Sequence, residues 1–180
     1  MGGASRSEVT FMSNSKAIRA VFPGVFDPVT NGHLGIIERG RHMFDELIVM
    51  VGKNPEKEAL FLEEERVEML RELVQGMGNV TVDLHTGLTW EFVTSRKSHV
   101  ILRGIRDGVD LRSELMQANT NRIVGDVETV FLVASTEHAL TSSTLIKQVV
   151  SMGGFDADRL TRLVPPLVAE KLKSRLGGGS

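Results

Sequence analysis

Short apolar runs alternate with longer amphipathic segments along the chain. Continuous apolar runs are typical of strands buried on both faces of a sheet, and apolar residues at every third or fourth position are typical of helices that cover it. We expect strands at five apolar runs, which are residues 17–21, 47–51, 80–84, 100–102 and 129–133. This alternation predicts an α/β fold with a doubly wound parallel sheet, in which ligands bind at the carboxyl ends of the strands.

The amphipathic segments predict helices on both faces of the sheet. We expect these helices at about 33–44, 62–74, 107–122 and 145–150, with a last helix that begins near Pro165 and Pro166. In segment 107–122, Leu111, Leu115 and Ala118 recur at helical spacing and are expected to face the core. The last helix is expected to cap the domain or to contact another subunit.

The length of the chain, 180 residues, is typical of one domain with a single core. We expect that domain to span residues 17–176. Residues 1–16 and 177–180 are small and polar and lack periodicity, so they are expected to be mobile tails.

Charge and composition narrow the function. A net charge of -2 provides no basic field for a nucleic-acid backbone, so a small phosphorylated ligand is expected and a nucleic acid is not. The chain has no run of about 18 apolar residues and its first residues lack an apolar signal stretch, which predicts a cytoplasmic protein without a membrane partner. The absence of cysteine excludes disulfides, thiolate metal sites and a cysteine nucleophile.

Residues 22–33 join the first predicted strand to the first predicted helix and include the sequence PGVFDPVTNGH. His33 falls in the first helical turn, where unpaired amide N–H groups and the positive end of the helix dipole attract anions. A lone histidine near a helix start is more often structural, but this strand–turn–helix context favours contact with a phosphate. His42, His85 and His99 show no metal-ligand spacing and are expected either to lie at the surface or to have their hydrogen bonds satisfied within the protein.

Three cations follow predicted strands and are expected to reach one crevice, namely Lys57, Arg103 and Arg106. Gly104 is expected to allow a tight turn, so that the two guanidinium groups clamp separate phosphates. Lys57 can equally be solvated in a charged loop, and Glu114 can lie on a solvated helix face. The cluster of hydroxyl residues at 141–144 predicts a helix cap, and the same helix amino terminus can cradle a phosphate.

Together these motifs resemble the nucleotidyltransferase superfamily, which is marked by T/H-x-G-H, here residues 30–33, and by a late Ser/Thr-rich helix cap. Within it, residues from about 18 to 176 resemble the bacterial phosphopantetheine adenylyltransferase family. Four stretches in the same order carry this resemblance, residues 23–33, 62–67, 103–106 and 114–122. The resemblance implies a Rossmann-like nucleotidyltransferase fold and transfer of the adenylyl group of ATP to 4'-phosphopantetheine, giving dephospho-coenzyme A and pyrophosphate.

The resemblance also implies roles for individual residues. His33, Lys57 and Arg106 would be catalytic, and the acceptor would be bound by Val25, Lys57, Thr89 and Arg103. ATP would be contacted by Val25, Phe26, His33, Gly104, Ile105, Arg106, Glu114, His138, Ala139, Leu140, Thr141, Ser142, Ser143 and Thr144. Mg²⁺ would accompany ATP and screen the leaving pyrophosphate, without a metal site built from protein side chains. A homohexamer and feedback inhibition by coenzyme A are further implications.

Three alternatives stay open at this point. A nicotinamide or nicotinate mononucleotide adenylyltransferase shares the first motif and a late Ser-Ser-Thr, and a cytidylyltransferase for an alcohol phosphate is a further choice. A non-catalytic nucleotide-binding paralogue is suggested by Val25, Ser113 and Ala139, where the family usually carries other residues. The stretch 103–106, together with Lys57, favours phosphopantetheine as the acceptor.

Overall fold

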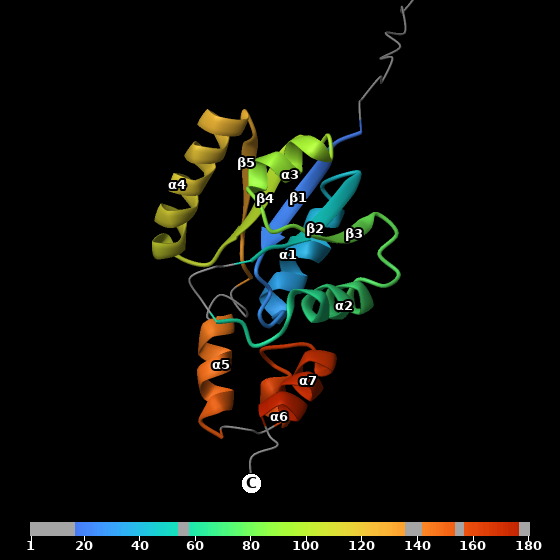
Figure 1. The fold of residues 1–180 in the computed structure, drawn as a ribbon, viewed down its shortest axis with the longest axis vertical. Coiled ribbons are helices and arrows are strands. Elements are labelled where there is room, and N and C mark those ends of the chain that lie inside the picture. The colour runs from blue at the N-terminus through green and yellow to red at the C-terminus, as the bar shows by residue number, and fades with distance from the viewer. Residues whose placement is uncertain (1–16, 54–57, 136–141, 154–156, 177–180) are drawn as a thin grey trace, which may run out of the picture.

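The computed structural model describes residues 17–53, 58–135, 142–153 and 157–176, and these form a five-stranded sheet with helices around it (Figure 1). The strands are β1 (Arg19–Gly24), β2 (Glu46–Val51), β3 (Val80–Leu84), β4 (Val100–Ile105) and β5 (Glu128–Val133). The helices are α1 (Asn31–Arg41), α2 (Glu63–Leu73), α3 (Thr89–Ser95), α4 (Gly108–Gly125), α5 (Ser143–Ser151), α6 (Ala157–Leu160) and α7 (Pro166–Leu176). Every strand pair is parallel and the order is β3-β2-β1-β4-β5, which confirms the predicted doubly wound sheet.

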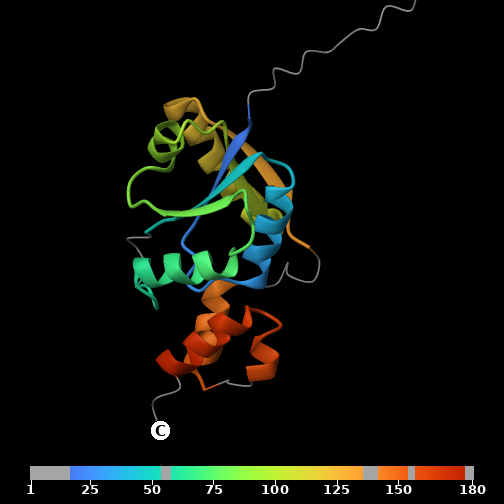
Figure 2. The same ribbon diagram turned by 90° about the vertical axis from the view of Figure 1, so that its right-hand side faces the viewer.

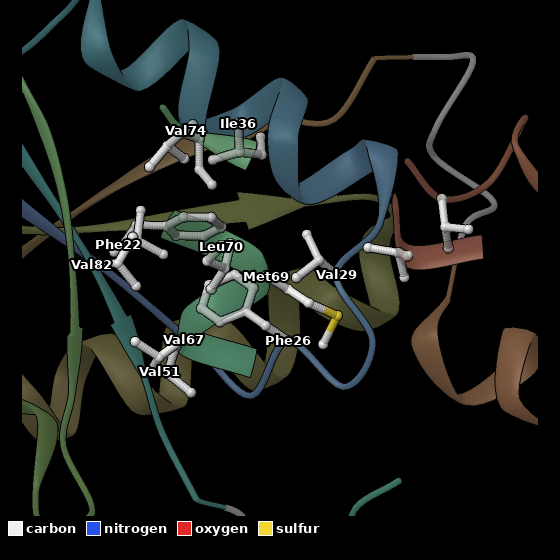
Figure 3. Packing of buried hydrophobic residues seen from close by; sticks show 14 of the residues in the cluster. Phe22, Phe26, Val29, Ile36, Val51, Val67, Met69, Leu70, Val74 and Val82 are labelled. Carbon is white, nitrogen blue, oxygen red and sulfur yellow. The ribbon is translucent and has the colours of Figure 1, made fainter. Parts of the chain in front are cut away.

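Alternate side chains of the central strands β1, β2 and β4 enter two apolar layers, one on each face of the sheet. On one face, Phe22 of β1 belongs to the same buried cluster as Leu70 of α2, and Figure 3 shows both side chains in that layer. On the other face, Val21 of β1 packs in a cluster with Phe92 and Val93 of α3. Because both faces are buried, the strands need the continuous apolar runs that the sequence displays. In the described part of the chain, no helix has the length and apolar composition needed to cross a bilayer.

Helices α5, α6 and α7 lie together beyond the carboxyl ends of the strands (Figure 1, Figure 2). Ile146 of α5 and Leu172 of α7 are fully buried in the same cluster as the sheet residues. The first residue of α1 is tied to this group, because the backbone N–H of Asn31 donates to the Leu163 carbonyl at 2.9 Å. The last helix therefore caps the end of the sheet where the strands finish.

The sheet opens between β1 and β4. These two strands are paired only at Ala20–Val100 and Val21–Ile101, whereas β1 stays paired with β2 as far as Gly24. Pro23 falls in the opened stretch, where a residue without an N–H removes no ladder bond to β4. Since the strand order reverses between β1 and β4, this opening lies where doubly wound sheets bind their ligands.

Strand β4 is longer than its apolar run, which corrects the expectation for Gly104. The sequence places a tight turn at Gly104, but β4 continues to Ile105 and stays paired with β5 over its whole length. A Cβ at Gly104 would lie 3.1 Å from Cγ1 of Ile36. The glycine is therefore needed for close packing of β4 against α1 rather than for a turn.

The face that α4 turns to the sheet is polar, so the predicted apolar stripe was wrong for Leu111 and Leu115. Both leucines are exposed, at 38% and 44%, and no residue of α4 is fully buried. The partly buried positions of α4 recur at helical spacing and include Asp110, Glu114 and Ala118. Of the predicted stripe only Ala118 lies on that face. The helix is rotated because its carboxylates pair with arginines at the end of β4, as described below.

Candidate active site

A cavity of about 300 Å³ lies at the opening between β1 and β4. Five segments line it, which are the end of β1 with the turn after it, the start of α1, the end of β4 with the first turns of α4, the residue after β5, and the start of α5. Predicted site residues that line it are Val25, Phe26, His33, Arg103, Gly104, Arg106, Glu114, Ser142, Ser143 and Thr144. Segments that are distant in the sequence therefore contribute to one site.

The remaining predicted site residues lie elsewhere. Ile105 is buried and does not line the cavity, and its contact with ATP stays a prediction. Thr89 lies in a small adjoining hollow of about 20 Å³, which Arg103 and Glu114 also line. Lys57, His138, Ala139, Leu140 and Thr141 lie outside the described residues.

A second cavity, of about 260 Å³, shares a wall with the first. The shared residues are Val25, Phe26, His33, Ser143 and Thr144. The second cavity is also lined by Lys53 and Glu58, which flank residues 54–57, and by Arg66 of α2 and Lys147 of α5. His33 thus stands between two cavities, which is a suitable arrangement for bringing two ligands together.

His33 is held by a reciprocal cap at the start of α1. Its backbone N–H donates to Oγ1 of Thr30 at 3.2 Å, and the backbone N–H of Thr30 donates to Nδ1 of His33 at 3.1 Å. The ring also packs against the Phe26 ring in a T-shaped arrangement, with centroids 5.0 Å apart and an angle of 72° between the planes. Because a backbone N–H can only donate, Nδ1 is the acceptor and the neutral ring carries its proton on Nε2. The Nε2–H is then the donor that this ring can offer to a ligand.

The charge state of His33 follows from its surroundings. Burial, together with the positive charges of Arg106 and Arg103, lowers the pKa of His33 from 6.5 to about 4. The imidazole is therefore neutral at neutral pH. It can donate a hydrogen bond, but it is a weak base and brings no charge of its own.

Arg103 bridges β4, β1 and α4 across the opening in the sheet. Its Nε and Nη2 each donate to the Glu114 carboxylate at 2.6 Å, and its Nη1 donates to the Pro23 carbonyl at 2.6 Å. Glu114 is accordingly an ion-pair partner rather than a solvated side chain. A guanidinium has five N–H donors, and these bonds use three of them, so two remain for a ligand.

Arg106 follows the last residue of β4 and pairs with Asp110, which lies one helical turn before Glu114 in α4. Its Nε donates to Oδ2 of Asp110 at 2.6 Å, and its Nη2 donates to Oδ1 of Asp110 at 2.9 Å. This hydrogen bonding lowers the pKa of Asp110 and raises the pKa of Arg106. Both guanidinium groups therefore reach the cavity already oriented by a carboxylate, which the sequence alone did not predict.

The start of α5 forms the far side of the cavity. Ser142 is the N-cap in extended conformation, without a side-chain capping bond, and its carbonyl accepts the first helical bond from Ile146 at 2.9 Å. The hydroxyl of Ser143 donates to the Pro28 carbonyl at 2.9 Å. The first backbone N–H groups of a helix have no intrahelical partner, so this end of α5 is suited to an anion.

Two buried charged residues beside the site were not singled out from the sequence. Asp27 is 4% exposed, and its carboxylate accepts from the Leu60 and Phe61 N–H groups and from Nζ of Lys147. The sequence could have indicated this, because Asp27 lies between Phe26 and Pro28 in an otherwise apolar turn. A carboxylate buried in such a turn needs hydrogen-bond partners.

Arg66 is the second such residue, and it is 1% exposed. Its Nη1 donates to the Val25 carbonyl at 2.6 Å and to the Gly52 carbonyl at 3.1 Å, so it joins the turns that follow β1 and β2. The sequence predicts a helix over the stretch 62–67. It does not predict that Arg66 is buried and lines the second cavity.

The fold and the site are those of a nucleotidyltransferase-like protein. Residues 21–149 match the family model described as Cytidylyltransferase-like, so the chain belongs to this family. Its fold is also that of nicotinic acid mononucleotide adenylyltransferase from Plasmodium falciparum complexed with NaAD, with a TM-score of 0.67, 12% identity, and coverage of 88% of this chain and 95% of that one. At this identity the likeness shows the fold alone.

Curated relatives narrow the family to phosphopantetheine adenylyltransferases. The chain is 46% identical over 154 residues to the phosphopantetheine adenylyltransferase of Gloeothece citriformis, covering 85% of this chain and 96% of the relative. The enzyme of the same name from Carboxydothermus hydrogenoformans is 45% identical over 157 residues, 87% of this chain and 94% of the relative. The one from a Nocardioides species is 46% identical over 161 residues, 89% of this chain and 99% of the relative.

Proposed function

We propose that the protein transfers the adenylyl group of ATP to 4'-phosphopantetheine, giving dephospho-coenzyme A and pyrophosphate. The observation that carries this proposal is the convergence of His33, Arg103, Arg106 and the start of α5 on one cavity, which a second cavity and a smaller hollow adjoin. A reaction between two phosphorylated substrates needs two adjoining sites and positive charge at their junction.

On the nucleotide side, the proposed contacts are the amino end of α5, Arg106 and His33. The backbone N–H groups of α5 would receive phosphate oxygens, and Arg106 would offset their charge. The Nε2–H of His33 would donate to an oxygen of the α-phosphate. That bond strengthens as charge grows on the phosphate in the transition state, which is how a fixed donor lowers a barrier.

On the acceptor side, Arg103 is the proposed anchor for the phosphate of phosphopantetheine, through the two N–H groups that its internal bonds leave over. The adjoining hollow, lined by Thr89 and Asn121, would receive the start of the pantetheine arm. Within the described residues, Oγ1 of Thr129, which lines this hollow, is the one buried side-chain polar atom without a hydrogen-bond partner. A polar acceptor arm would satisfy it. The role of Lys57 stays a proposal based on the family resemblance.

The chemistry then requires little proton transfer. A phosphomonoester has a second pKa of about 6, so its attacking oxygen is already anionic at neutral pH. That oxygen forms a bond to the α-phosphorus of ATP while the bond from this phosphorus to the bridging oxygen breaks, and the electron pair leaves with pyrophosphate. No general base is needed, in agreement with the weak basicity of His33.

Mg²⁺ is proposed to arrive with ATP rather than to occupy a site of its own. In the described part of the chain, no three histidine, aspartate or glutamate side chains group together as metal ligands. Asp110 and Glu114, the carboxylates that line the main cavity, already pair with Arg106 and Arg103. The described residues therefore do not form a Mg²⁺ site of protein side chains. The ion would bind to the triphosphate of ATP and neutralise part of its negative charge.

A panel of acceptors tests this proposal. The protein would be incubated with ATP, Mg²⁺ and phosphopantetheine, nicotinamide mononucleotide, nicotinate mononucleotide or glycerol 3-phosphate, with CTP in place of ATP in a parallel series, and products would be identified by mass. We expect dephospho-coenzyme A from phosphopantetheine alone. Dinucleotide products from the mononucleotides would favour the sister enzymes, and tight ATP binding without turnover of any acceptor would favour a non-catalytic paralogue.

Assembly and regulation are further parts of the proposal. We propose a homohexamer, which the exposed apolar residues of α4 support, among them Val109 at 82% and Ile123 at 83% exposure. Sedimentation measures the state of assembly, and a monomer at micromolar concentration would contradict it.

Coenzyme A is proposed as a feedback inhibitor because it contains the same pantetheine arm as the acceptor, so its inhibition should be relieved by added phosphopantetheine.

A further inference from the structure

Asp27 lies where three segments of the site meet. It belongs to the turn after β1, two residues beyond Val25, and its carboxylate is almost completely buried. Oδ1 accepts from the Phe61 N–H at 3.0 Å, and Oδ2 accepts from the Leu60 N–H at 2.9 Å and from Nζ of Lys147 at 2.8 Å. One side chain thus joins the turn, the segment before α2 and helix α5.

The bond to Lys147 holds the end of α5 that faces the cavities. Lys147 lies one helical turn after Ser143, and the Ser143 hydroxyl donates to the Pro28 carbonyl at 2.9 Å. The two acceptors, on Asp27 and Pro28, are adjacent in the chain. The first turns of α5 are therefore attached at two points, both of them polar, to the turn that leads from β1 into α1 and His33.

The rest of α5 is held differently. Ile146 and Val150 are buried in the main apolar cluster, and α5 contacts α7. Loss of the Lys147 bond would therefore leave the helix packed on α7 while its amino end loses one of two attachments. Such a change shifts the position of the backbone N–H groups without unfolding the domain.

We propose that Asp27 is a positioning residue which, through its ion pair with Lys147, fixes the amino end of α5 relative to His33. The proposal rests on the proposed function only for the identity of the ligand, ATP. A misplacement of phosphate-binding groups by about 1 Å can cost up to about a hundredfold in rate, so one well-placed ion pair is enough to have a measurable effect.

A rival explanation is that Lys147 contacts the phosphates itself, since it also lines the second cavity. The two explanations make different predictions for Asp27→Asn, a variant that removes the carboxylate but retains the lysine at position 147. Positioning predicts that Asp27→Asn and Lys147→Met each weaken ATP binding by roughly tenfold, and that the double variant is no worse than either. Direct contact predicts that Asp27→Asn binds ATP as tightly as the wild type, and this result would overturn the proposal.

The test measures ATP affinity by calorimetry and kcat and KM by pyrophosphate release, with Lys147→Arg as the conservative variant and Lys173→Met, an exposed lysine of α7, as the matched control. We expect Lys147→Arg to recover binding to within about threefold, because a guanidinium can still reach Asp27. Lys173→Met should match the wild type. If Asp27→Asn fails to fold, wild-type ATP affinity and kcat in Lys147→Met would still contradict positioning, and a loss of affinity in that variant is assigned to positioning or to direct contact by hydrogen exchange of α5 without ligand.

Amide hydrogen exchange separates this inference from the proposed function. In Lys147→Met without any ligand, the amides of residues 146–148, which are the first in α5 with intrahelical bonds, should exchange faster, while those of α7 should be unchanged. If the wild type showed no adenylyl transfer but this local change were seen, the proposed function would fail and the positioning role would stand. Unchanged exchange in α5 would refute the positioning role, whatever the enzyme assay shows.

Discussion

Thr30 and His33 cap the same helix end reciprocally, each through its backbone N–H to the side chain of the other. A glutamate or glutamine usually completes such a capping box, and here an imidazole does so. The cap thereby fixes both the orientation of the ring and the nitrogen that carries its proton. Helix stability and the chemistry of the site depend on one pair of hydrogen bonds.

Replacing Thr30 with Val should therefore affect stability and catalysis together. Loss of the cap is expected to cost about 1 kcal/mol in the free energy of unfolding. It should also lower kcat, because the imidazole loses the contact with the Thr30 hydroxyl, which lies 3.1 Å from Nδ1. Denaturant unfolding and steady-state kinetics measure the two effects. Thr30→Ser keeps the hydroxyl and should stay close to the wild type, and equal losses in both variants would contradict this account.

Truncation of His33 tests its proposed contact with the α-phosphate. His33→Ala is expected to lower kcat by about a hundred- to a thousandfold, the range for removal of one preorganised charge-stabilising donor. ATP binding should be retained, because the start of α5 and Arg106 still contact the triphosphate in the proposed arrangement. An unaltered kcat would remove His33 from the mechanism. His42→Ala, at an exposed histidine at the end of the same helix, is the matched control.

The lowered pKa of His33 predicts a pH dependence of stability. Because its pKa is about 4 in the folded protein and 6.5 in the reference state, the unfolded chain binds the proton more readily between these values. The contribution of His33 is thus constant above about pH 6.5 and becomes destabilising as the pH falls towards 4. His33→Gln should lose less stability over this interval than the wild type. NMR titration of the ring should give a midpoint near 4, and a midpoint near 6.5 would refute the assigned environment.

Arg103→Lys should separate the internal role of Arg103 from its proposed role in binding. An ammonium group cannot form both bonds to Glu114, the bond to Pro23 and two more to a phosphate. We expect the KM for the acceptor to rise by about tenfold or more, with a smaller change for ATP. Arg122→Lys alters an exposed ion pair with Glu128 and is expected to change neither constant. Equal changes in the two KM values would argue against an acceptor-specific contact.

Two glycines at opposite ends of α4 predict opposite effects of the same substitution. A Cβ at Gly125 would lie 2.5 Å from Cβ of Trp90 in α3, whereas a Cβ at Gly108 would meet nothing within 4 Å. Gly125→Ala should therefore destabilise the protein by about 1–3 kcal/mol through overpacking. Gly108→Ala should stabilise it by roughly 0.5 kcal/mol through lower entropy of the unfolded chain. Thermal unfolding checks both, and a neutral Gly125→Ala would show that α3 and α4 can separate at little cost.

The sheet could be predicted because the central strands β1, β2 and β4 are buried on both faces and their apolar runs are unbroken. Residues 80–84 match β3 without adjustment, while β4 extends past its apolar run through Arg103 and Gly104. Those residues are held by pairing with β5, a long-range contact that periodicity does not record. Strand lengths at the site were therefore less predictable than strand positions in the core.

The candidate site could be predicted as a set of residues but not as a network. His33, Arg103 and Arg106 could be chosen because their types suit phosphates and they follow strands. The carboxylates that orient the arginines lie on α4, where a helical pattern suggested Leu111 and Leu115 as the inner face. Which face of an amphipathic helix turns inward is decided here by ion pairs with another element, and that partner is visible only once both elements are placed.

Strands β1 and β4 stop pairing with each other after Val21 and Ile101. Beyond this point β1 continues to pair with β2, and β4 continues to pair with β5. The opening is thus defined by strand pairing, and the side chain of Arg103 spans it. Substitutions on its rim can therefore change the side chains that face a ligand while the pairing of the strands is kept. The same fold is accordingly found at 12% sequence identity in nicotinic acid mononucleotide adenylyltransferase from Plasmodium falciparum.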